Sequence, residues 1–147
     1  MPGGMRTWTW ISRVGRLPRL WLGCAVALGL SGGAGRRAAR DGLVAAVLTD
    51  RLVSWVLKPL FGRSRPARGA APPDMPGDAS LPSAHAANGF AFATVVSRSV
   101  PSSTGSLYLA ASAVAVSRVA LGFHHVSDVV AGAALGYAIG TRFGREH

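Results

Sequence analysis

Long apolar stretches broken by short polar ones make up most of the chain. Helices are predicted over about residues 20–35, 42–61, 84–100, 104–121 and 127–143. The segment 66–83 is too rich in proline, glycine and aspartate for regular structure. Because a helix satisfies its own backbone hydrogen bonds in an apolar environment, the pattern predicts an all-α fold, an integral membrane bundle of about five helices.

Composition and charge narrow the class of protein. Of 147 residues, 49% are hydrophobic and 15% are charged, which is more apolar than an ordinary soluble domain. A net charge of +10 suits nucleic acid, an anionic membrane surface or a phosphorylated substrate. The long apolar stretches argue against nucleic acid, since such proteins keep their basic face on a soluble fold. We divide the chain into a basic N-terminal segment, 1–19, and a membrane domain, 20–147.

Two of the predicted helices carry unusual residues. The last has a glycine at every fourth position, Gly132, Gly136, Gly140 and Gly144, and this face lets another helix approach closely, either within the chain or in a homo-oligomer. In the second, Asp50 and Arg51 interrupt an apolar stretch, where charges are expected to be paired or functional. Arg51 lies seven residues before Lys58, close to the same helical face, and one hypothesis directs it toward the site described next.

Polar residues gather in three clusters, at 58–66 (KPLFGRSRP), 82–85 (PSAH) and 117–128 (SRVALGFHHVSD). If the helices alternate in direction, all three clusters lie on the same side of the membrane. Alternation alone therefore predicts a single site at one membrane interface.

The cations of these clusters suit a phosphate group. Lys58, Arg65 and Arg118 are positively charged, and the planar fork of arginine matches phosphate oxygens in pairs. Ser83, with the first amides of the helix that follows it, adds further donors for an anion. The clusters therefore predict a site for phosphate, or for the charge that develops when a phosphoryl group is transferred.

Histidines and an aspartate add reactive groups. His124 and His125 both lie within helical reach of Asp128, whose carboxylate can accept an Nδ1 proton and leave Nε2 as a nucleophile. Spacing does not choose between them. His85 is placed to protonate a leaving oxygen and then to activate water. No second carboxylate or thiolate cluster offers metal ligands, so we favour a phosphohistidine route with no metal and no cofactor.

The three clusters resemble the motifs of the type 2 phosphatidic acid phosphatase (PAP2) superfamily. Those motifs are Lys, six residues, Arg-Pro; Pro-Ser-Gly-His; and Ser-Arg, five residues, His, three residues, Asp. The first and third are matched in full, with His124 in register, whereas Ala84 stands in place of the motif glycine. The resemblance implies that His124 is the nucleophile, Asp128 its partner and His85 the general acid. It also implies that phosphate is bound by Lys58, Arg65, Ser83, the amide of Ala84 and Arg118.

The resemblance implies a membrane phosphatase that acts on a lipid phosphate monoester or diphosphate. Phosphatidic acid, phosphatidylglycerol phosphate and polyprenyl phosphates or diphosphates are all candidate substrates, and a composition typical of a GC-rich bacterial genome favours the polyprenyl group. A lipid phosphotransferase, a vanadate-dependent haloperoxidase-like enzyme and a non-catalytic binder of anionic lipids are the alternatives. The implied location is the plasma membrane, crossed several times, with the site outside the cytoplasm. The arginines divide evenly between the two sides, so the positive-inside rule does not set the orientation.

Overall fold

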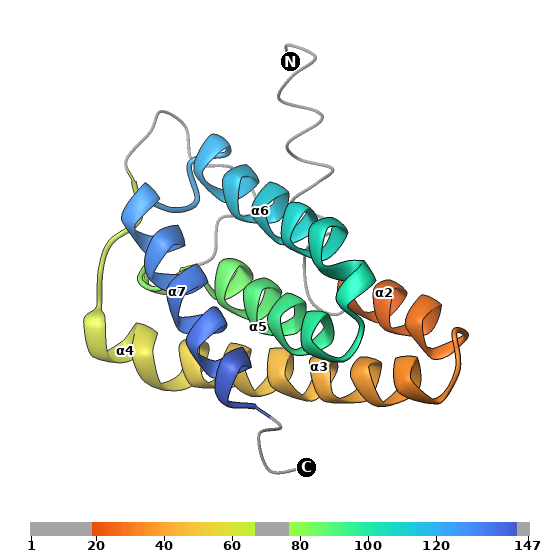
Figure 1. Ribbon diagram of the computed structural model, residues 1–147. Helices are drawn as coiled ribbons and strands as arrows, with labels where there is room; N and C mark the ends of the chain where they lie inside the picture. The colour runs from red at the N-terminus through yellow and green to blue at the C-terminus, as the bar shows by residue number, and fades with distance from the viewer. Residues whose placement is uncertain (1–18, 67–76, 144–147) are drawn as a thin grey trace.

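A computed structural model describes residues 19–66 and 77–143, and all regular structure in these ranges is helical (Figure 1). The prediction of an all-α fold is confirmed. All but one residue of the predicted basic N-terminal segment, 1–19, lies outside the described residues. In chain order the elements are α2 (Arg19–Gly29), α3 (Gly33–Leu52), the π-helical turn η1 (Val53–Leu57), α4 (Lys58–Phe61), α5 (Ala84–Ser99), the 3₁₀ turn η2 (Pro101–Ser103), α6 (Thr104–Ala120) and α7 (Val126–Arg142).

Helix α5 is the centre of the bundle. It packs against α3, α6 and α7, while α2 lies along α3 (Figure 1). The core around it contains mostly alanine, with Trp21 and Phe92 as its largest side chains, their ring centroids 5.2 Å apart. Such small residues let neighbouring helices approach closely, so the first turn of α5 is held firmly between its neighbours.

The glycine face of α7 packs against α5 within the chain. A methyl group on Gly136 would lie 2.0 Å from the carbonyl oxygen of Ala87, and one on Gly132 would lie 2.4 Å from that of Ser83. Gly140 meets the side chain of Thr94 in the same way, while Gly144 lies outside the described residues. Of the two predicted uses of this face, the structure shows packing within the chain, so these three glycines are not open to a second copy.

The boundary between the first two helices differs from the prediction. Helix α2 ends at Gly29 and α3 already begins at Gly33, so the basic run 36–40 lies inside a helix instead of after one. Gly32 makes the turn with a φ of 111°, a conformation that favours glycine. In the basic run the arginines are exposed while Ala38 and Ala39 are buried. The run is therefore an amphipathic helical turn, which a search for continuous apolar stretches does not find.

The second predicted helix is interrupted just before the first motif. The π-helical turn η1 leads directly into Lys58, and α4 is closed after Phe61 by its C-cap residue Gly62, whose φ is 57°. A π-turn accommodates one extra residue and so changes the helical face on which later residues lie. Lys58 is accordingly buried, whereas Arg51 is exposed and stacks 4.5 Å from the ring centroid of Trp55. The hypothesis that Arg51 faces the site is wrong, and its neighbour Asp50 instead accepts a hydrogen bond from Asn88 (3.2 Å).

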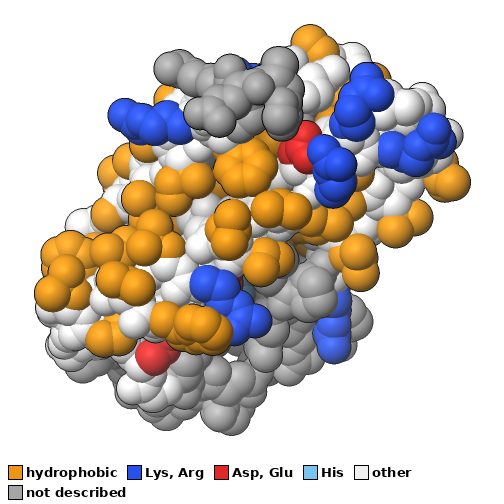
Figure 2. Space-filling view, turned by 90° about the horizontal axis from the view of Figure 1, so that it is seen from below, with side chains coloured by type: hydrophobic (Ala, Val, Ile, Leu, Met, Phe, Trp, Pro, Cys, Tyr) orange, Lys and Arg blue, Asp and Glu red, His pale blue; other side chains and the backbone are white. Residues whose placement is uncertain are grey.

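Large apolar side chains lie on the outside of the bundle. Figure 2 shows them in orange over the face where α3 and α4 lie, together with several basic side chains. Exposed large hydrophobic residues occur on α2, α3, η1, α4, α6 and α7, among them Leu22, Leu48, Trp55, Leu60, Leu109 and Val130. None of the described helices combines the length and the apolar character needed to cross a membrane.

Candidate active site

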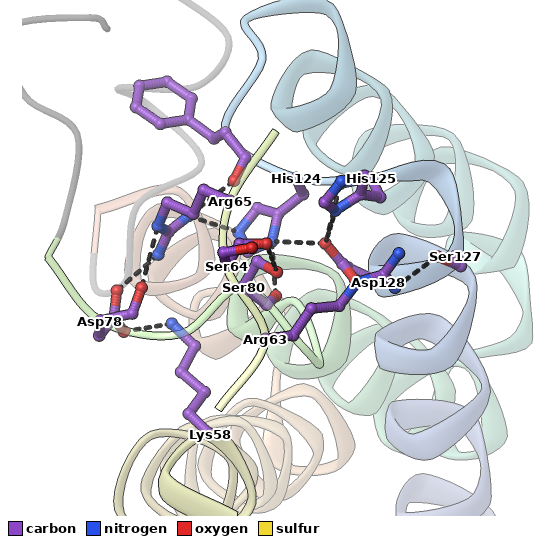
Figure 3. Close-up of polar contacts among 11 residues, drawn as sticks. Lys58, Arg63, Ser64, Arg65, Asp78, Ser80, His124, His125, Ser127 and Asp128 are labelled. Atoms are coloured by element: carbon purple, nitrogen blue, oxygen red, sulfur yellow. Dashed lines mark hydrogen bonds and ion pairs between the residues drawn. The ribbon is translucent and has the colours of Figure 1, made fainter. Parts of the chain in front are cut away.

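The first and third sequence clusters meet at one end of the bundle. Lys58 begins α4, Arg65 follows in the segment after it, and His124 lies in the turn between α6 and α7 (Figure 3). Nη1 of Arg65 lies 3.4 Å from Nε2 of His124 and donates to the carbonyl oxygen of Phe123 at 2.7 Å. Residues that are 59 positions apart in the sequence are therefore in direct contact, as the alternation of helix directions predicted.

Two irregular segments, 62–66 and 77–83, hold this arrangement together. The backbone N–H of Ser80 donates to the carbonyl of Arg63 at 2.8 Å, and its hydroxyl donates to the carbonyl of Ser64 at 3.0 Å. The carbonyl of Ser80 in turn lies 2.8 Å from Nδ1 of His124. Ser80 thus fixes the segment 63–65 and the imidazole relative to one another, a contact that the sequence did not reveal.

The protonation state of His124 follows from these neighbours. A carbonyl oxygen only accepts hydrogen bonds, so Nδ1 carries the proton and Nε2 keeps its lone pair toward Arg65. Burial lowers the pKa of His124, and the charges of Arg65, Arg118 and Lys58 lower it further, to about 3. The hydrogen bond to Ser80 opposes this shift. A neutral imidazole with a bare Nε2 beside three cations is suited to attack an electrophile that carries negative charge.

Asp128 occupies a different position from the predicted one. Its Oδ2 lies 3.8 Å from Nδ1 of His124, too far for a hydrogen bond, so the predicted contact is not formed. Oδ1 instead accepts from Arg63 at 2.9 Å, and Oδ2 accepts from the backbone N–H of His125 at 2.8 Å. Arg63 also donates to Ser127 at 2.8 Å. Because these donors take both oxygens of a fully buried carboxylate, His124 finds its acceptor in the Ser80 carbonyl.

His125 has a structural role in this arrangement. It is the N-cap residue of α7, and Asp128, three residues later, closes the first turn of that helix onto it. Its Nδ1 lies 3.2 Å from Oδ2 of Asp128. The sequence placed His125 within reach of Asp128 but did not predict this capping role, because a capping contact depends on where the helix begins.

The second cluster forms the start of α5. Ser83 is the N-cap residue, and its backbone N–H donates to the carbonyl of Asp128 at 2.9 Å, which joins this helix to α7 beside the third motif. Among the described residues, the fully buried hydroxyl of Ser83 has no hydrogen-bond partner. Buried hydroxyls are rarely left in that state, so this group is available to a bound anion. His85 is on the same first turn.

Ala84 and Arg118 complete the predicted set. Ala84, which replaces the motif glycine, belongs to a buried apolar cluster with Val53 and Ala87, so its methyl group is accommodated by packing. Arg118 is buried in the last turn of α6, with its guanidinium carbon 4.0 Å from the ring centroid of Phe123. Its backbone carbonyl accepts a hydrogen bond from the N–H of His124 at 3.2 Å, and its charge helps to lower the pKa of that imidazole.

Known proteins resemble this chain over the range that contains the site. The family model described as the PAP2 superfamily matches residues 42–144, which include all three clusters. The chain belongs to the PAP2 superfamily. A crystal structure described as a transmembrane PAP2-type phosphatidylglycerolphosphate phosphatase from Bacillus subtilis is similar, with 27% sequence identity and a TM-score of 0.72. The alignment covers 97% of this chain and 76% of that one. A search of curated proteins finds no match.

Membership in the PAP2 superfamily, together with this structural similarity, identifies the chain as a phosphoric ester hydrolase. The PAP2 motifs account for Lys58, Arg65 and His124 at the centre of the site, but they omit residues that the structure adds. Asp78 is the most notable, because its carboxylate contacts both Lys58 and Arg65 (Figure 3). An aspartate in a loop between two basic motifs was the only sequence signal for it.

An open pocket of about 620 Å³ lies next to these residues. Lys58 and Arg65 belong to its wall, together with Ser54, Pro59, Arg63 and Asp78. The volume falls within the range of small-molecule sites. Arg65 both lines this pocket and contacts His124, so an anion bound to Arg65 there would lie on the Nε2 side of the imidazole.

Proposed function

We propose that this protein is a lipid phosphatase that acts at a membrane through a phosphohistidine intermediate, without a metal. The observation that carries the proposal is the contact between Arg65 and Nε2 of His124, at an imidazole whose pKa the charges of Arg118 and Lys58 also lower. These groups combine cations for a phosphate with an unprotonated nucleophile for its phosphorus atom. The crystal structure of a transmembrane PAP2-type phosphatase supports a membrane lipid as the substrate.

The proposed reaction has two steps. Nε2 of His124 attacks phosphorus and forms an N–P bond while the bond from phosphorus to the leaving oxygen breaks, and His85 protonates that oxygen. His85 then removes a proton from water, whose oxygen attacks phosphorus and breaks the N–P bond to release inorganic phosphate. Lys58, Arg65, Arg118, the Ser83 hydroxyl and the amide of Ala84 stabilise the phosphoryl oxygens in both steps.

The surface of the bundle supports the membrane setting. Many large apolar side chains are exposed on the outside of the bundle, while alanine makes up much of its interior, an arrangement typical of membrane bundles. The phosphate of a lipid would then lie at the membrane interface, with its apolar chain beside the bundle. Within this setting we place the protein in the plasma membrane with its site outside the cytoplasm. A phosphate monoester or diphosphate on a glycerolipid or a polyprenyl chain is the substrate class.

The test is phosphate release from a panel of such lipids in detergent with EDTA present. We expect the wild type to be active and His124→Ala to lose at least 10³-fold, a typical effect of removing a nucleophile. The matched control is His125→Asn, because asparagine keeps a good N-cap at the start of α7. Loss of wild-type activity on chelation, or hydrolysis by His124→Ala, would contradict the mechanism. Adding an alcohol acceptor and analysing the products separates hydrolysis from phosphoryl transfer.

A further inference from the structure

Asp78 engages the same cations that the proposed function assigns to the substrate phosphate. Its Oδ1 lies 2.5 Å from Nη2 of Arg65, and its Oδ2 forms an ion pair with Nζ of Lys58. Nε of Arg65 also donates to the backbone carbonyl of Asp78 at 3.1 Å. Each carboxylate oxygen thus contacts one cation, as two oxygens of a bound phosphate would.

The side chains of the two cations and of Asp78 differ in how far they are exposed to solvent. The side chains of Lys58 and Arg65 are 7% exposed, whereas that of Asp78 is 45% exposed. Ser80, two residues later, is buried and hydrogen-bonded to the segment 63–65, so the backbone beyond Asp78 is anchored. The Asp78 side chain can therefore rotate toward solvent while the cations and His124 keep their places.

From this geometry we propose that Asp78 competes with the substrate and product phosphate for Lys58 and Arg65. The inference rests on the proposed function, because it assigns both cations to the phosphate. In the empty enzyme the carboxylate neutralises part of the charge that several buried cations create. A phosphate group must displace it on binding, and its return helps inorganic phosphate to leave. Asp78 thus weakens phosphate binding and assists product release without touching the reacting atoms.

The experiment compares Asp78→Asn with the wild type by the KM for a lipid phosphate, the kcat and the Ki for inorganic phosphate. Asparagine keeps the shape of the side chain but removes its charge. We expect the Ki and the KM to fall about tenfold, a modest factor because the ion pairs of a partly exposed carboxylate are weak. We expect kcat not to rise, since phosphate leaves more slowly. A side chain with a merely structural role would not strengthen phosphate binding when removed.

Two further variants make the test specific. Asp41→Asn is the matched control, since Asp41 pairs with its neighbour Arg40 at 2.9 Å outside the site, and it should leave all three constants unchanged. Asp78→Glu keeps the charge and should stay near the wild-type Ki. An unchanged or higher Ki in Asp78→Asn, or an equal fall in Asp78→Glu, would overturn the inference.

Thermal unfolding with and without inorganic phosphate separates this inference from the proposed function. A ligand that binds the folded state raises the melting temperature according to its affinity, and no turnover is required. We expect phosphate to stabilise Asp78→Asn more than the wild type. If no variant hydrolyses a lipid phosphate but this difference is found, the proposed function fails and the competition stands. Equal phosphate stabilisation in the two proteins, including none in either, rejects the competition.

Discussion

At the scale of single residues, the environment of His124 determines how the site responds to pH. This residue lies in the turn between α6 and α7, where burial and then the charges of Arg65, Arg118 and Lys58 lower its pKa to about 3. We therefore expect its imidazole to stay neutral, with the proton on Nδ1, from pH 8 down to pH 5 in the free enzyme. Nitrogen-15 NMR of labelled histidine, with the signal assigned by His124→Asn, measures both properties. A titration near the ordinary value of 6.5 would contradict the prediction.

The same shift has a consequence for stability. Because the pKa in the folded protein is below the ordinary value, the unfolded chain takes up a proton first as the pH falls. The contribution of neutral His124 to stability is therefore intact above about pH 6.5 and is lost progressively as the pH falls toward about 3.

The sequence predicted which motif residues meet but not how each is held. Spacing within motifs and alternating helices sufficed to bring Lys58, Arg65 and His124 together. The sequence predicted that Nδ1 of His124 contacts Asp128, whereas in the structure it contacts the backbone carbonyl of Ser80. Every residue type has a backbone carbonyl, so the sequence does not indicate which one accepts this hydrogen bond. Arg63 and Asp78 were missed for a related reason, since their contacts depend on the path of irregular segments that no periodicity describes.

At the scale of helices, the close contact between α5 and α7 sets the geometry of the site. A methyl group on Gly136 would lie 2.0 Å from the carbonyl of Ala87, a backbone atom that cannot move without shifting α5. We expect Gly136→Ala to lower the free energy of unfolding by about 2 kcal/mol or more, as overpacking in tight interiors does. Thermal or denaturant unfolding in detergent measures the change.

Gly23→Ala in α2 is the matched control, because an added methyl group there meets no atom within 4 Å. Alanine has a higher helix propensity than glycine, so this variant should be as stable as the wild type or more stable by up to about 1 kcal/mol. If both substitutions were equally tolerated, α5 and α7 would not pack as closely as described.

Helix boundaries were predicted correctly where prolines and serines separate two apolar stretches. They were not predicted where the helix begins with an amphipathic turn or contains a π-turn. The starts of α5 and α6 follow prolines and serines and agree with the prediction. The start of α3 was misplaced because its first turns are amphipathic, with arginines outside and alanines inside. The π-turn η1 has no residue signature, although it decides that Lys58 and not Arg51 enters the site.

At the scale of the whole molecule, the cations of the site and the apolar outer surface match the two parts of the proposed lipid substrate. The cations of the site gather at one end of the bundle, and large apolar side chains cover the outside of α2, α3, α4, α6 and α7. A lipid phosphate has the same two parts, an anionic group and an apolar chain. In the proposed function, the anionic group would bind the cations of the site while the apolar chain lies along the exposed apolar side chains.

The apolar outer face is open to a direct test through Trp55. This side chain is 68% exposed on η1, and Leu60 and Phe61 on the following α4 are exposed as well, whereas Trp21 is fully buried in the core. In vesicles whose acyl chains carry bromine, we expect Trp55 to be quenched on contact and Trp21 to be protected. With Trp8 and Trp10 replaced by phenylalanine in both proteins, Trp55→Phe removes this signal and leaves Trp21, so its fluorescence should be quenched much less than that of the parent that keeps Trp55. Equal fractional quenching would show that the face formed by η1 and α4 does not contact the acyl chains, and the proposed placement of the lipid chain beside it would be wrong.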